Sequence, residues 1–89
     1  MMRVITQSNL IVRAMYINGA IAIAHGDTGA FVPMSSIILP TAAVNGTIVT
    51  GLSLVETQRG NLVLDLVFSD VTPPLAYISR DGGNTWDVL

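Results

Sequence analysis

The sequence predicts an all-β domain, a small antiparallel β-sandwich or barrel that is completed by oligomerisation. Ile, Val, Leu and Thr dominate the apolar stretches, and turn-forming residues interrupt them about every eight to twelve positions. No stretch places its apolar residues at the 3.6-residue spacing of an amphipathic helix. The length of 89 residues fits one domain, residues 1–89, and leaves no room for two.

The first half begins with a hairpin. Residues 9–17 form a strand candidate with two distinct faces, and Asn18-Gly19 follows it. Asn-Gly favours a two-residue type I′ turn, because both positions need a positive φ. Residues 20–25 are then expected to return antiparallel, with their isoleucines facing inward and small alanines opposite.

Two further extended segments follow, each with a position that marks an irregularity. Residues 30–39 read as extended but contain Pro33, which indicates an edge strand or a bend. The Asn-Gly pair at 45–46 predicts another turn. Residues 47–56 form the next strand candidate, with a β-bulge expected at Gly51.

Residues 62–69 give the strongest strand signal, and residues 75–79 lead from it into the last turn. The strand is apolar on both faces apart from Asp65, which predicts that both faces are covered. In so small a domain the second cover is expected to be another subunit. The predicted core or interface ridge consists of Leu62, Leu64, Leu66 and Phe68.

The composition combines a high apolar content with few charges. Hydrophobic residues make up 51% of the chain and charged residues 11%, where about 25% charged is typical. No apolar run reaches the roughly 20 residues of a membrane-spanning helix, so we expect no membrane insertion. The start lacks the apolar core of a secretory signal peptide. Other protein chains are therefore the expected cover, in a homo-oligomer (a trimer or higher) or a larger assembly.

Residues that could bind a metal, contact nucleic acid or act as an acid or base are scarce. There is no cysteine, and with one histidine a His-rich zinc site is excluded. Four scattered arginines and a net charge of −2 argue against a nucleic-acid-binding face. His25 and Asp27 offer an acid–base dyad, although a polar strand end is the simpler interpretation. Asp65 is either a buried functional carboxylate or a residue that faces solvent or pairs with an arginine such as Arg13.

The C-terminal run is the one motif with a defined pattern. Residues 79–86 fit S-x-D-x-G-x-T-W, whose fixed positions are Ser79, Asp81, Gly83, Thr85 and Trp86. The Asp81 carboxylate is expected to accept hydrogen bonds from its own turn. Gly82 and Gly83 permit positive φ, and the Trp86 ring is expected to cover the turn. The run therefore predicts a self-stapled hairpin turn.

This run resembles the Asp box, or BNR repeat, of sialidases and related β-propellers. The resemblance implies a structural turn that lies away from any catalytic pocket. The chain carries one box where propellers carry several, and its dispersed arginines and two tyrosines could not build a sialidase-like site. We therefore expect no catalytic, cofactor-binding or metal-binding residues, and no enzymatic activity.

In overall character the chain resembles small accessory structural proteins of tailed bacteriophages: it is short, β-rich and apolar, without lysine or cysteine. The resemblance implies a virion component, in capsid decoration, the head or neck, or the tail, that is present in the host cytoplasm during assembly. Residues 1–10 could then be an extended arm. The alternative is a carbohydrate- or surface-binding module with Trp86, Tyr77 and Tyr16 as stacking platforms, although nothing specific supports a glycan. An enzyme such as a reduced glycosidase is the weakest reading, because no pair of acidic groups has a defined spacing.

Overall fold

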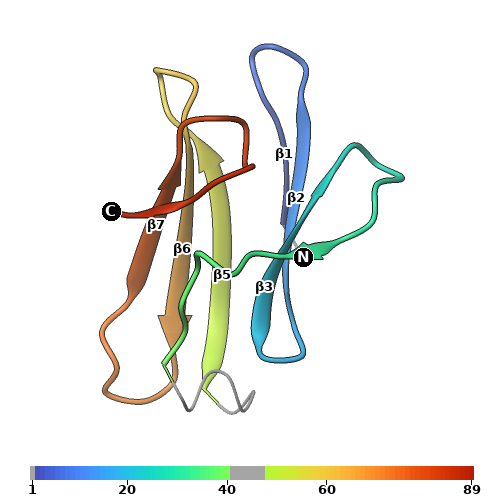
Figure 1. The fold of residues 1–89 in the computed structure, drawn as a ribbon. Helices are drawn as coiled ribbons and strands as arrows, with labels where there is room; N and C mark the ends of the chain where they lie inside the picture. The colour runs from blue at the N-terminus through green and yellow to red at the C-terminus, as the bar shows by residue number, and fades with distance from the viewer. Residues whose placement is uncertain (1, 41–47) are drawn as a thin grey trace.

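The computed structural model describes residues 2–40 and 48–89, which form two layers of β-sheet (Figure 1). Each half of the chain supplies one sheet, and within each sheet the strands that follow one another in sequence pair antiparallel. The strands are β1 (Met2–Ile5), β2 (Ile11–Ile17), β3 (Ala20–His25), β4 (Val32–Pro33), β5 (Val49–Glu56), β6 (Leu62–Phe68), β7 (Leu75–Ser79) and β8 (Asp87–Val88). The described residues contain no helix, so the prediction of an all-β, antiparallel fold is confirmed.

The first sheet has the order β1-β2-β3-β4. Asn18 and Gly19 have φ values of 52° and 75°, as the predicted type I′ turn between β2 and β3 requires. The extended segment predicted for residues 30–39 is wrong in length, because the strand spans only Val32–Pro33, with one further backbone hydrogen bond from Met34 to Ile21. The short strand β4 lies at the edge of the sheet, where a residue without a backbone N–H is tolerated.

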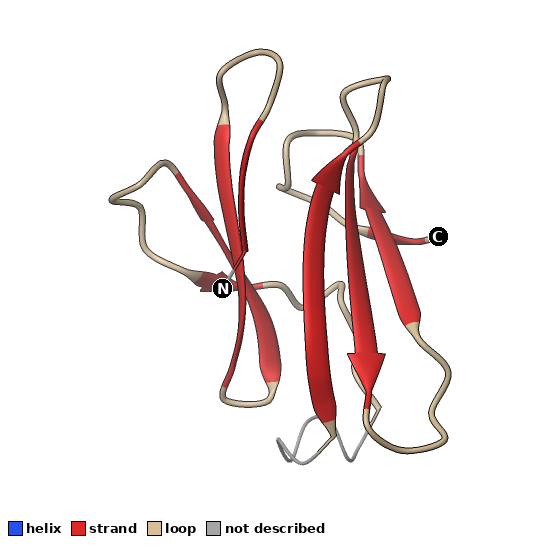
Figure 2. Ribbon diagram, turned by 180° about the vertical axis from the view of Figure 1, so that it is seen from behind, coloured by secondary structure: helices blue, strands red, loops and turns tan. Residues whose placement is uncertain are grey.

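The N-terminal residues belong to this sheet. β1 pairs with β2 from Met2 opposite Ala14 to Ile5 opposite Ile11. Residues 2–5 therefore form an edge strand and not an extended arm. The turn after β1 also contacts the second sheet, since the Gln7 backbone N–H donates to a Glu56 carboxylate oxygen at 3.0 Å. Figure 2 shows β1 and β5 in neighbouring positions of the two layers, and their residues are in contact.

The second sheet has the order β5-β6-β7-β8. Its register slips near the start of β5, because Val49 lies opposite Phe68 and Gly51 lies opposite Val67, with Thr50 as the extra residue. This is the bulge predicted at Gly51. The turn predicted at 45–46, and Thr47 at the start of the predicted strand, lie outside the described residues.

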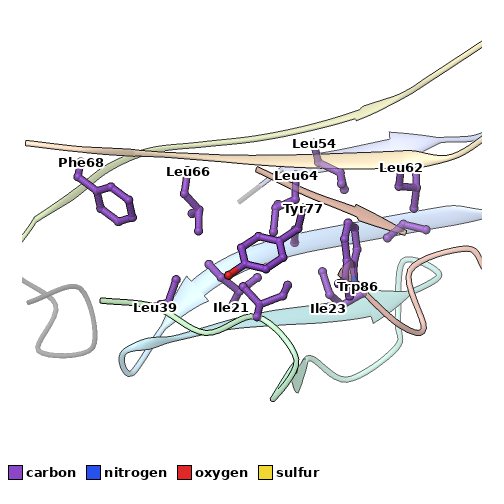
Figure 3. Packing of buried hydrophobic residues seen from close by; sticks show 13 residues of the cluster. Ile21, Ile23, Leu39, Leu54, Leu62, Leu64, Leu66, Phe68, Tyr77 and Trp86 are labelled. Carbon is purple, nitrogen blue, oxygen red and sulfur yellow. The ribbon is translucent and has the colours of Figure 1, made fainter. Parts of the chain in front are cut away.

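The core lies between the two sheets (Figure 3). The predicted ridge of β6 points into it: Leu62, Leu64 and Leu66 are fully buried and Phe68 nearly so. The isoleucines of β3 face the ridge from the other sheet. Residues 34–40 run along the gap between the sheets beyond β4, and the Tyr77 hydroxyl donates to the Ile38 carbonyl at 2.9 Å. The chain therefore covers this face of β6 with its own residues.

Candidate functional site

Two features qualify for a functional role: the turn at residues 79–86 and the outward face of the second sheet. In the turn, one carboxylate oxygen of Asp81 accepts hydrogen bonds from the Ser79 hydroxyl at 2.8 Å and the Thr85 backbone N–H at 2.9 Å. The other accepts from the Thr85 hydroxyl at 2.6 Å. The Ser79 hydroxyl oxygen in turn accepts from the Gly83 backbone N–H at 2.8 Å. The polar atoms of the turn are thus directed at one another.

The electrostatics of this turn favour an ionised carboxylate. The pKa of Asp81 is lowered to about 2, mainly by the hydrogen bond from the Thr85 hydroxyl, with further help from the Thr85 backbone N–H and the Ser79 hydroxyl. Hydrogen bonds that favour the charged form have this effect on an exposed carboxyl. A general acid must hold its proton near neutral pH, so Asp81 is unsuited to that role.

The turn also joins the two sheets. Gly82 and Gly83 have φ values of 75° and 94°, a conformation that other residues rarely adopt. The Gly82 carbonyl lies 2.8 Å from the Nε2 atom of His25, at the end of β3 in the first sheet. A side chain at position 82 would begin 2.9 Å from a methyl group of Leu10. The turn therefore closes one end of the sandwich by close contact with the first sheet.

The aromatic rings of this region are part of the core. Trp86 is 2% exposed, and its indole N–H donates to the Gly83 carbonyl at 3.0 Å. Tyr77 is 3% exposed. Both rings lie between the sheets in Figure 3. Sugar stacking needs an open ring face, and neither residue offers one.

Two other residues considered in the sequence, Asp27 and Arg13, make contacts within the first sheet and its loops. Asp27 accepts two hydrogen bonds from the Arg3 guanidinium, at 2.8 and 3.0 Å, and this contact is the main cause of its lowered pKa. Arg13 donates to the Gly26 and Gly29 carbonyls at 2.9 and 2.7 Å. The suggested pairing of Arg13 with Asp65 is therefore wrong, because the two residues belong to different sheets.

The outward face of the second sheet, here called the outer face, is open. Cross-strand register places Val55 beside Val63, and Val63 beside Ile78, in one apolar row across three strands. Val55 is 49% exposed, and Val67 on the same face is 47% exposed. The alternation of residues in the sequence predicted that Val63, Asp65 and Val67 share one face of β6. It did not predict the row with Val55 and Ile78, because that row depends on the register between neighbouring strands.

Asp65 lies on the outer face next to this row. It sits between Ser53 and Ala76 and is partly buried. Its carboxylate has no hydrogen-bond or ion-pair partner within residues 2–40 and 48–89. A carboxylate on an apolar strand face normally has a partner or free access to water. The outer face thus combines uncovered apolar side chains with a charge that nothing in the described chain neutralises.

A shallow hollow of about 220 Å³ lies between β2 and β5. Its lining consists of Met15, Tyr16, Val49, Thr50, Gly51 and Leu52. None of these side chains is charged, so the hollow offers no groups for acid–base chemistry.

Comparisons with family models, curated proteins and solved structures gave no match to this chain. Across the described ranges, no helix has the length and apolar character needed to cross a membrane. In the same ranges, His, Asp and Glu do not gather in any group of three that could hold a metal ion. The turn and the outer face are therefore the features of the molecule that indicate a function.

Proposed function

We propose that the protein is a structural assembly component, which acts by packing against other protein chains. The observation that carries the proposal is the outer face of the second sheet. Monomeric proteins rarely leave a continuous apolar patch open, and larger open patches mark interaction sites. Here an apolar row crosses three strands in a chain that is only 11% charged.

A virion is the setting we propose for this packing. The support is the type of chain: a small, β-rich, lysine-free and cysteine-free protein, which resembles accessory structural proteins of tailed bacteriophages. The role would be capsid decoration, or a place in the head, neck or tail. The turn at residues 79–86 serves such a role as a rigid closure of the sandwich, because it fixes one end of both sheets.

The structure offers little support for the alternative of a carbohydrate-binding module. Trp86 and Tyr77 are core residues, so two of the three proposed stacking rings have no accessible face. The Asp81 carboxylate of that turn already accepts hydrogen bonds from the hydroxyls of Ser79 and Thr85. A sugar would need open rings flanked by free hydrogen-bonding groups.

The mass of the protein in solution tests the proposal. Sedimentation equilibrium of the full chain across a wide concentration range should give a mass above the 9.4 kDa of one chain. A monodisperse monomer that stays soluble at every concentration would contradict an assembly role. Neighbouring genes test the virion setting separately: capsid, portal or tail genes beside this one would support it, and genes for a metabolic pathway would contradict it.

A further inference from the structure

We infer that the sheet edges of this chain are closed to strand addition, and that the bulge at Thr50 closes the one long edge. Contacts with other chains are then made by side chains and not by extension of either sheet. The inference concerns the backbone edges, so it stands or falls independently of the proposed assembly role.

Three of the four edge strands are short. The described sheets end in β1 and β4 on one layer and in β5 and β8 on the other. An edge strand presents unpaired N–H and C=O groups, with which an extended segment of another chain can pair. β1 has four residues, while β4 and β8 have two each, and Pro33 of β4 has no N–H group to donate. These three edges therefore offer few backbone groups to a further strand.

β5 is different, because it has eight residues. Just beyond it, the Thr57 N–H donates to the Asn61 carbonyl at 2.7 Å, next to the first pair of the ladder between β5 and β6. Residues along an antiparallel ladder alternate between bonding to the partner strand and pointing away from it. Counting back from Thr57, Leu54 and Leu52 direct their backbone N–H and C=O groups to the free edge. An added strand would pair with these groups.

The bulge interrupts this edge near the start of β5. Thr50 is an extra residue between Val49, which lies opposite Phe68, and Gly51, which lies opposite Val67. An extra residue bends the bulged strand and shifts its backbone groups out of the regular spacing that an added strand needs. Bulges of this kind are one means by which proteins prevent pairing between sheet edges.

The turn after β1 limits the other end of the same edge. The Glu56 carboxylate accepts hydrogen bonds from the Gln7 backbone N–H at 3.0 and 3.3 Å, so this turn lies against the end of β5. Residues 52–55 are the regular stretch that remains between the bulge and this contact. The longest edge is thereby reduced to the length of β1.

Amide hydrogen exchange of the wild type, measured over a wide range of protein concentration, tests the inference. The N–H groups of Leu52 and Leu54 should exchange freely at every concentration, whereas pairing with another strand would slow them at least about tenfold. The N–H groups of Ser53 and Val55, which the same alternation directs at β6, are the internal reference. Protection of the two leucine N–H groups that rises with concentration would overturn the inference.

Deletion of Thr50 tests the role of the bulge, because it leaves the cross-strand pairs of β5 in place. This variant should form a larger species than the wild type in sedimentation equilibrium, and its Leu52 and Leu54 N–H groups should become protected as the concentration rises. Thr50→Val is the matched control, because it keeps the extra residue and removes only the hydroxyl, which donates to the Val67 carbonyl at 3.3 Å. The control should behave like the wild type.

The outcomes separate this inference from the assembly role. A deletion variant that is folded by circular dichroism but leaves Leu52 and Leu54 unprotected would overturn the inference. The wild-type exchange measurement does not depend on the folding of that variant. A wild-type monomer with freely exchanging leucine N–H groups would contradict the assembly role and support the closed edges.

Discussion

A charged residue on the outward face of the first sheet has partners within the chain, whereas one on the outward face of the second sheet has none among the described residues. On the first sheet, Arg13 lies on an apolar strand face, but Gly26, Gly29 and Phe31 fold back over it. Its guanidinium donates to both glycine carbonyls and lies 4.8 Å from the centre of the Phe31 ring. On the second sheet, Asp65 occupies a similar position in mid-strand and has no partner in the described chain.

The difference indicates which face the fold completes by itself. Ala24, which lies opposite Arg13, is almost fully buried, although it points away from the core. Val67, on the outer face of the second sheet, is about half exposed. The connection between β3 and β4 passes over the first sheet, and no described segment makes the corresponding contacts with Asp65. The uncovered sheet is therefore the one for which we propose a partner.

The largest expected effect is a difference in folding stability between substitutions on the inward and outward faces of β6. Leu64→Asp would place an unpaired charge in the core and should destabilise the fold by about 4 kcal/mol or more, enough to unfold a small domain. Val63→Asp changes the preceding residue, on the outer face. At a protein concentration low enough to keep the chain monomeric, it should cost about 1 kcal/mol or less. Thermal unfolding followed by circular dichroism measures both. If the two variants unfold alike, the assignment of the inward and outward faces is wrong.

A smaller loss of folding stability is expected from a substitution in the turn at residues 79–86, where it contacts the first sheet. Gly83→Val imposes a positive φ on a β-branched residue beside Val12 and His25, and should cost about 2–3 kcal/mol. Gly26 also has a positive φ, of 76°, but a Cβ atom added there would have no atom within 4 Å apart from its chain neighbours. Gly26→Val therefore measures the backbone strain alone. Equal losses of unfolding free energy in the two variants would show that the packing of the turn contributes nothing.

The local parts of this fold were predictable from the sequence. The turn at Asn18-Gly19, the bulge at Gly51 and the inward ridge of β6 depend on neighbours in the chain, so spacing and residue type indicate them. The turn around Asp81 is local in the same sense, since every hydrogen bond of its carboxylate joins residues within four positions.

Contacts between distant segments were not predictable. The apolar row depends on the register of three strands, and one shifted residue would have turned Val55 into the core. The contact of His25 with Gly82 spans 57 positions. Arg13 was given the wrong partner because spacing along the chain does not tell which sheet a strand joins.

Arg13 holds the connection between β3 and β4 against the outward face of the first sheet, so its substitution tests that contact. Arg13→Met keeps the aliphatic part of the side chain but leaves the Gly26 and Gly29 carbonyls without their donor, which should cost about 1–2 kcal/mol. Arg59→Met is the control, because Arg59 is exposed and unpaired in the described chain, and it should change stability by less than about 0.5 kcal/mol. Urea unfolding of both variants gives the difference. A loss no larger than that of the control would remove the contrast between the sheets.

The smallest effect should appear only in acid, at the turn that closes the sandwich. The folded-state pKa of Asp81 is about 2 and its unfolded value is about 3.9. A lowered pKa stabilises the fold above the unfolded value, and that contribution is lost as the pH falls from about 4 toward 2. Thr85→Val removes the main cause of the shift, so NMR titration should show a higher pKa for Asp81 and the stability should fall less steeply in this range. An unchanged pKa would mean that the Thr85 hydroxyl does not hold the Asp81 carboxylate in solution.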